Sequence, residues 1–206
     1  MGAGRGRPRA FDRDAALGQA MRVFWERGYE AASLAELTEA MGIRPPSLYA
    51  AFGSKEQLFR EAVELYGRTE GGVTARALDE AATAREAIGE TLRGNALVYT
   101  EPGSPTGCMI VLAATNCAPE HEAVRSLLCD DRRAMERSLR DRMDRGVAEG
   151  DVPAGTDTRA LAAFYATVLF GLSVQSRDGA SRDDLLAVVD AAMASWDALV
   201  RTTPER

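Results

Sequence analysis

Residues 33–59 gather the side chains that could hydrogen-bond to phosphates and to the edges of bases. Arg44, Ser47 and Tyr49 fall on the outward side of a short predicted helix that follows a glycine turn. Lys55 comes directly after Ser54, at the start of the next predicted helix, where backbone N–H groups favour an anion. Donors in this arrangement predict contacts to a DNA groove and to its backbone.

Two short helices must hold these groups in place. Ser33 and Glu36 form a capping box that opens the first helix, and Gly42 ends it. Pro45 and Pro46 can occupy the first turn of the second helix, where a missing N–H costs nothing. The apolar positions of the pair are Leu34, Leu37, Met41, Ile43, Leu48 and Phe52. A helix-turn-helix needs this division between a buried apolar side and an outward polar side.

The same pattern also fits two consecutive helices that only pack together, so the flanking residues matter. Upstream, Arg5, Arg7 and Arg9 lie on a Gly/Pro-interrupted segment that cannot be helical. Such an arm is expected to follow phosphates or to enter a minor groove. Downstream, Ser54 and Gln57 predict a second capping box. Both flanks favour DNA binding.

The first 66 residues or so closely resemble the DNA-binding domain of the TetR family of bacterial regulators. The resemblance runs in order through GRPR, FDRDAALGQAMRVFWERGYEAASLAELTEAMGI and PPSLYAAFGSKEQLFREAVELY. It implies three helices in an N-terminal head and a fourth that connects the head to a ligand-binding body. The contacts that it implies are to phosphate for Ser33 and Lys55, to bases or the groove for Arg44, Pro46 and Ser47, and to groove or backbone for Tyr49. Ala50 departs from the family's usual polar or aromatic residue, which leaves only a thymine-methyl contact there.

Composition and charge describe a soluble globular chain. It has 206 residues, 46% of them apolar and 27% charged, with a formal net charge of −6. Residues 1–60 hold nine Lys/Arg against seven Asp/Glu, which leaves −8 for the remainder. A basic-leaning head on an acidic body would orient the molecule toward DNA. Three cysteines without CxxC spacing fit a reducing cytoplasm, and the longest apolar run, residues 160–174, is too short to cross a bilayer.

Helical periodicity extends along nearly the whole chain, so the predicted fold class is all-α. The predicted divisions are a basic arm (residues 1–10), a helix-turn-helix domain (11–54), a connecting helix (55–71) and a ligand-binding and dimerisation domain (72–206). In the body we expect helices from the Thr83 cap to about residue 99, over residues 108–117 and from Pro119 to Gly150. Two more are expected over residues 157–176 and from the Ser181 cap onward.

The last two helices have wide apolar faces, which must be covered on several sides. Candidate residues for a dimer interface are Leu161, Val168, Leu172, Leu185, Val189 and Trp196. A core within one chain explains the pattern equally well. The TetR resemblance favours pairing across a two-fold axis, and a dimer could read a palindromic operator with half-sites about 34–36 Å apart.

A small-molecule site in the body is expected to combine apolar walls with a few polar groups. The candidate residues are Tyr99, Cys108, Met109, Leu112, Asn116, Phe164 and Tyr165. Each of them also fits a plain core position. Cys108 follows Gly107 at a predicted helix start, where the helix dipole would favour a reactive thiolate that senses oxidants or electrophiles. A buried, inert cysteine is the alternative.

An enzyme is the weaker alternative. The one histidine, His121, lies in a charged segment with no nucleophile at a recognised spacing, and we expect it to be a solvated surface residue. No cofactor or metal motif is present in the sequence. A helical adaptor that does not bind DNA is a second alternative, and it predicts no salt-dependent DNA binding. The sequence favours a cytoplasmic, ligand-responsive repressor that binds DNA as a homodimer.

Overall fold

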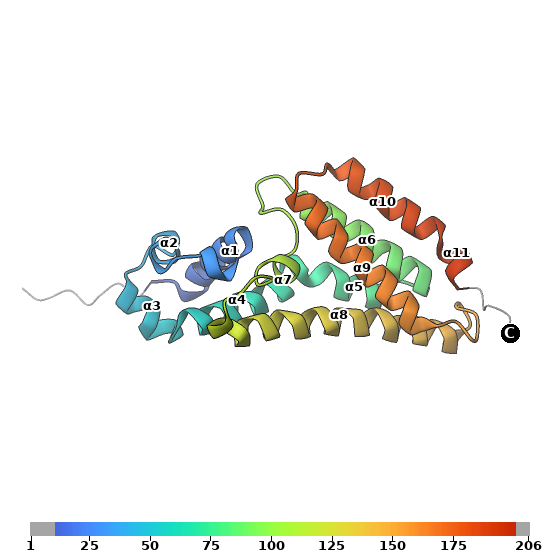
Figure 1. The fold of residues 1–206 in the computed structure, drawn as a ribbon, viewed down its shortest axis with the longest axis horizontal. Helices are drawn as coiled ribbons and strands as arrows, with labels where there is room; N and C mark the ends of the chain where they lie inside the picture. The colour runs from blue at the N-terminus through green and yellow to red at the C-terminus, as the bar shows by residue number, and fades with distance from the viewer. Residues whose placement is uncertain (1–10, 201–206) are drawn as a thin grey trace, which may run out of the picture.

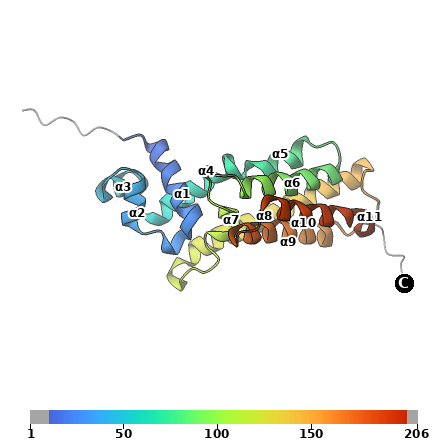
Figure 2. The same ribbon diagram turned by 90° about the horizontal axis from the view of Figure 1, so that it is seen from above.

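The computed structural model describes residues 11–200, and every regular element in that range is a helix, as predicted. The head consists of α1 (Arg13–Ala31), α2 (Leu34–Ala40) and α3 (Pro45–Phe52). Helix α4 (Lys55–Arg68) packs against α1 and leads from the head to the near end of the body (Figure 1). The head lies at one end of an elongated molecule, and the body helices run away from it (Figures 1 and 2).

Caps read from the sequence set the helix boundaries of the head. The Ser33–Glu36 capping box is present, and Pro45 and Pro46 begin α3. At α4 only half of the expected box forms, because the Ser54 hydroxyl accepts from the Gln57 N–H but no return bond is made. Each cap satisfies N–H groups that the first helical turn leaves free.

Aromatic side chains fill the core of the head and join it to α4. The Phe24 and Phe59 rings meet edge to face at a centroid distance of 5.0 Å, and the Trp25 and Tyr66 rings do so at the same distance. All four side chains are at most 1% exposed. This packing makes α4 part of the head's core, so a displacement of α4 must carry the head with it.

The body contains more elements than the periodicity predicted. They are η1 (Glu70–Gly72), α5 (Val73–Glu80), α6 (Ala84–Tyr99), α7 (Met109–Leu112), η2 (Pro119–His121), α8 (Glu122–Glu149), α9 (Thr158–Arg177), α10 (Arg182–Ala194) and α11 (Trp196–Leu199). Helix α5 was not predicted. The helix expected over residues 108–117 is the single turn α7, and the last expected helix breaks at Ser195 into α10 and α11.

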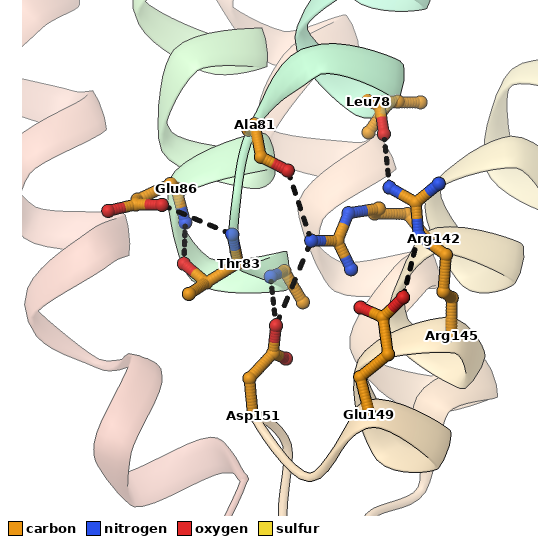
Figure 3. Close-up of polar contacts among 9 residues, drawn as sticks. Leu78, Ala81, Thr83, Glu86, Arg142, Arg145, Glu149 and Asp151 are labelled. Carbon is orange, nitrogen blue, oxygen red and sulfur yellow. Dashed lines mark hydrogen bonds and ion pairs between the residues drawn. The ribbon is translucent and has the colours of Figure 1, made fainter.

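Helix α6 lies at the centre of the body, where it packs against α5, α8, α9 and α10 (Figure 2). A polar cluster ties its start to the end of α8 (Figure 3). The Ala84 N–H donates to Asp151 at 3.0 Å, and the buried Arg142 guanidinium lies 3.7 Å from the same carboxylate. Arg145 donates to the Leu78 carbonyl at 2.9 Å. These bonds hold the end of the body that is farthest from the head.

The predicted dimer residues need a correction. The structure buries Leu161, Leu172, Leu185, Val189 and Trp196 within their own chain, each at most 4% exposed. Val168 is partly buried against the same core. Helices α9 and α10 pack on α6 and on each other, which is the single-chain core that the sequence left open. No helix among the described residues is both long enough and apolar enough to cross a membrane.

Candidate DNA interface and ligand cavity

The outer face of α3 carries the predicted groove contacts. Arg44, Pro46 and Tyr49 are exposed and Ser47 is half-buried. Tyr49 is 47% exposed, which is unusual for so large a ring. Beneath it Leu48 is fully buried, and Phe52 is 2% exposed. The helix is therefore anchored on one side and presents polar groups on the other, as a recognition helix requires.

The two predicted phosphate contacts near α3 are already engaged within the chain. The Ser33 hydroxyl donates to the Glu36 carboxylate at 2.8 Å, and Glu36 also pairs with Arg27 at 2.7 Å. Hydrogen bonds from the Ser33 N–H and hydroxyl lower the pKa of Glu36, so a negative charge stands beside Ser33. A phosphate at this point would have to use the N–H groups of α2 and avoid that carboxylate.

Lys55 lies at the junction between head and body. Its ammonium is 4.4 Å from the centre of the Tyr29 ring, a cation–π contact. Burial lowers the pKa of Lys55, while the nearby Glu30 acts in the opposite direction. The side chain therefore points toward Tyr29, and its role at a phosphate stays a prediction. The arm residues Arg5, Arg7 and Arg9 lie outside the described residues.

His121 is part of the same junction and is not the solvated side chain expected from the sequence. Its Nδ1 lies 2.7 Å from Glu30 Oε1, and its ring meets Tyr29 edge to face. The Ala118 N–H also donates to Glu30 at 2.9 Å. Hydrogen bonds from Ala118 and His121 lower the pKa of Glu30. Sequence spacing could not show this contact, because 91 residues separate the pair.

A cavity of about 530 Å³ lies between α4, α5, α6, α7 and α8. Its apolar walls include Val63, Leu78, Ile110, Leu127 and Met135. Its size and mainly apolar lining fit a small-molecule site.

Of the predicted ligand residues, only Cys108 lines this cavity. Tyr99, Met109 and Tyr165 are core residues, at most 2% exposed, and Leu112 packs against the core. Asn116 and Phe164 are exposed. The other predicted residues do not line this cavity, because periodicity places residues on a helix face but does not say which faces leave space between them.

Two polar lining residues that the sequence analysis missed are Asn95 and Asp131. A signal for both was present. Asn95 interrupts the apolar stripe of α6 between Leu92 and Tyr99, and Asp131 interrupts that of α8 after Leu128. A polar residue on a buried stripe must find a partner or face a cavity.

Cys108 is 4% exposed, and its backbone N–H donates to the Ser173 hydroxyl at 2.8 Å. The helix that it precedes has four residues, so the helix-dipole argument for a reactive thiolate loses its basis. The thiol lies close enough to the phenols of Tyr66 and Tyr99 to affect their pKa. Burial, followed by the neighbouring thiol, raises the pKa of both phenols well above its ordinary value.

The segment that forms one cavity wall also holds the head. The Trp25 indole N–H donates to the Gly107 carbonyl at 2.8 Å, in a buried position. The Tyr29 N–H donates to the Ala113 carbonyl at 2.7 Å. Cys108, which lines the cavity, lies between these two attachment points. A molecule that moves this wall must therefore act on α1.

The fold and these two sites define a DNA-binding transcriptional regulator with a helix-turn-helix head and a helical body that contains a half-open cavity. The family model described as "Bacterial regulatory proteins, tetR family" matches residues 16–62. The model described as "Tetracyclin repressor-like, C-terminal domain" matches residues 90–185. The chain belongs to the TetR family.

Relatives of known name support this assignment over nearly the full length. The HTH-type transcriptional repressor ComR of Escherichia coli (strain K12) is 35% identical over 96% of this chain and 94% of its own. The repressor BdcR of the same organism is 34% identical over 92% of this chain and 90% of its own. A cysteine mutant of the TetR family regulator CifR, solved with 26-bp double-strand operator DNA, is 57% identical. It has a TM-score of 0.90 and covers 92% of this chain and all of that one.

Proposed function

We propose that this regulator represses genes by binding a palindromic operator as a homodimer, and that a small molecule in the cavity releases it. The observation that carries the proposal is the shared segment of residues 107–113, which forms a cavity wall and holds the C-terminal part of α1. The repressor names of ComR and BdcR and the operator complex of CifR support the same output.

The proposed dimer surface is the outer face of α9 and α10. Phe164, Val174 and Val188 are 39%, 45% and 46% exposed there, although apolar side chains are normally covered. Pairing this face with its copy would place two heads on one side of the molecule. Two heads could then read half-sites about 34–36 Å apart, which one head could not.

Ligand coupling is proposed to use both α4 and the segment of residues 107–113. Val63 and Tyr66 of α4 line the cavity, and the same helix carries core residues of the head. A ligand that fits better when these walls are displaced shifts the population toward a head spacing that cannot span both half-sites. Coupling of about 1–3 kcal/mol is typical and is enough to change occupancy severalfold or more.

Selection of bound duplexes from random DNA tests the operator proposal, since it returns the site, its symmetry and its spacing. Arg44→Ala should relax base preference at one position of the selected site. Arg159→Ala is a matched control, because Arg159 is exposed on α9, far from α3 in the chain. Affinity should fall steeply with salt. A helical adaptor would show neither a preferred duplex nor a salt slope.

A second candidate is an electrophile or oxidant sensor that acts through Cys108. The observation that favours it is the position of this cysteine on the cavity wall. Alkylation by iodoacetamide forms an S–C bond and releases iodide and a proton. Operator affinity should then fall in the native protein and stay unchanged in Cys108→Ser. Equal loss in both rules this candidate out.

The remaining assignments rest on this function. We propose that the protein works in the cytoplasm, where its operator would be, and that it has no catalytic activity. The division into arm (1–10), DNA-binding domain (11–54), connecting helix (55–71) and body (72–206) follows the same proposal. The packing of α4 against α1 supports a connecting helix that follows the DNA-binding domain directly and moves with it.

A further inference from the structure

Two polar groups on the cavity wall, Asn95 and Ser138, can act toward a ligand only as hydrogen-bond acceptors. Both N–H bonds of the Asn95 amide are used, one to Thr74 Oγ1 at 2.9 Å and one to the Thr91 carbonyl at 2.8 Å. Asn95 can therefore only accept, through Oδ1. The Ser138 hydroxyl donates to the Ala134 carbonyl at 3.1 Å, so toward a ligand it too can only accept a hydrogen bond.

Asp131 is the strongest of these acceptors. Its Oδ2 atom is buried and has no hydrogen-bond partner among residues 11–200. Its neighbour Arg132 makes no hydrogen bond to it and donates instead to the Ile110 carbonyl at 2.9 Å, although the charge of Arg132 offsets part of the pKa shift of Asp131. Burial, and then the adjacent Asp130, raises the pKa of Asp131. Asp131 as a whole is half-buried, and a carboxylate oxygen without a hydrogen-bond partner is costly. Rotation of the carboxylate toward a positively charged donor in the cavity would remove that cost.

The positively charged residue in the cavity lining, Arg60, already has an acidic partner. Arg60 lines the wall, but its Nη2 and Nε lie 2.9 Å and 3.2 Å from the Glu56 carboxylate. Glu64 on the same helix adds a second negative group to the lining. The chain outside residues 1–60 carries a formal −8, which favours the approach of cations over anions.

We propose that the effector cavity takes a small organic amine, which places its protonated nitrogen against Asp131 and its apolar part against Ile110, Leu127 and Met135. This inference rests on the proposed function, since it names the chemical class of the molecule that releases the operator. A second donor on the ligand would reach Asn95 Oδ1. Carboxylates of the same shape are excluded, because Asp131 would repel them and the Arg60 guanidinium is already paired with Glu56.

Three probes of one shape and different charge test the proposal: 4-phenylbutylamine, 4-phenylbutanol and 4-phenylbutyrate. Binding to the full-length protein is measured by calorimetry, and operator release is measured separately by fluorescence anisotropy. The amine should bind more tightly than the alcohol, and the carboxylate should not bind. The amine proposal is overturned if the carboxylate binds as tightly as the amine or more tightly.

Asp131→Asn keeps the shape of the side chain and removes its charge. It should weaken binding of the amine about 10- to 100-fold, the range expected for loss of a buried hydrogen bond to a charged group. Binding of the alcohol should change much less. Asp130→Asn is the matched control, because Asp130 is exposed and pairs with Arg133 at 3.4 Å. If the two variants bind the amine equally, Asp131 does not hold the ligand.

The amine assignment and the proposed function fail in different ways. If the alcohol or the carboxylate releases the operator and the amine does not, the proposed function stands and the amine assignment is wrong. If the amine binds but operator affinity does not change, the cavity assignment stands and the release mechanism is wrong. Failure of the protein to bind any selected duplex refutes the proposed function without reference to the amine.

Discussion

Arg177 at the end of α9 donates hydrogen bonds to backbone carbonyls near the end of α1, one of which lacks its ordinary helical donor. Gly28 has a φ of +77°, which breaks α1, and the Tyr29 N–H turns to the Ala113 carbonyl. The Trp25 carbonyl is four residues before Tyr29 and so loses its ordinary helical donor. Arg177 replaces it, with donors 2.8 Å from the Trp25 carbonyl and 2.7 Å from the Glu26 carbonyl.

We expect Arg177→Met to lower the stability of the folded chain by about 2 kcal/mol. Each bond from a charged donor contributes about 1.5–3 kcal/mol. Part of this is offset, because burial lowers the pKa of Arg177 and its Nε has no partner among the described residues. For a chain of this size each kcal/mol shifts Tm by about 2–4 °C, so Tm should fall by about 4–8 °C.

Calorimetry at neutral pH measures the shift, and Arg159→Met on the same helix is the matched control, since Arg159 is exposed. Arg177→Lys should fall between the two, because an ammonium keeps the charge but cannot span both carbonyls as a fork. Operator affinity should fall with Tm, as the head loses a direct tie to α9. If Arg177→Met and Arg159→Met have the same Tm, the bonds from Arg177 to the Trp25 and Glu26 carbonyls do not stabilise the junction, and this prediction is refuted.

Three further outcomes are expected. Asp131→Asn should raise Tm at about pH 7 and leave it unchanged near about pH 3. Burial raises the pKa of this carboxyl, so its ionisation lowers the stability of the folded chain only as pH rises. A lower Tm of the variant at about pH 7 would contradict this. Gly107→Ala should destabilise the chain by more than about 1 kcal/mol in urea unfolding, since Gly107 has a φ of +74° and an added Cβ would lie 2.7 Å from the Ser173 carbonyl oxygen. Val188→Asp should convert a dimer to monomers in sedimentation, with Tm of the monomer preserved, and an unchanged dimer would move the interface elsewhere.

The head was readable from the sequence because its signals are local. The Ser33–Glu36 box, the two prolines after Arg44 and the buried pair Leu48 and Phe52 act within one or two turns of chain. Short-range signals of this kind place a helix and orient its faces whatever packs against it. The all-helical class and the exposed face of α3 followed from them.

The cavity and the exposed face of the proposed dimer surface depend on the tertiary structure. Both sets of candidates lay on apolar helix faces, and periodicity could not say which faces meet another helix, which meet space and which meet solvent. Leu185 and Phe164 show the difference, since one is buried and the other is 39% exposed. The polar interruptions at Asn95 and Asp131 were visible in the sequence, but only the packing of α4, α5, α6 and α8 shows that they face a common space.

The junction between head and body also depends on contacts distant in the chain. Trp25 and Gly107 are 82 residues apart, and Arg177 is 152 residues from Trp25. The sequence by itself determined which helices form and which side of α3 meets solvent, because capping and periodicity act over a few residues. Only the folded chain decided where α1 is held and what encloses the cavity, since those bonds exist only after distant helices have packed.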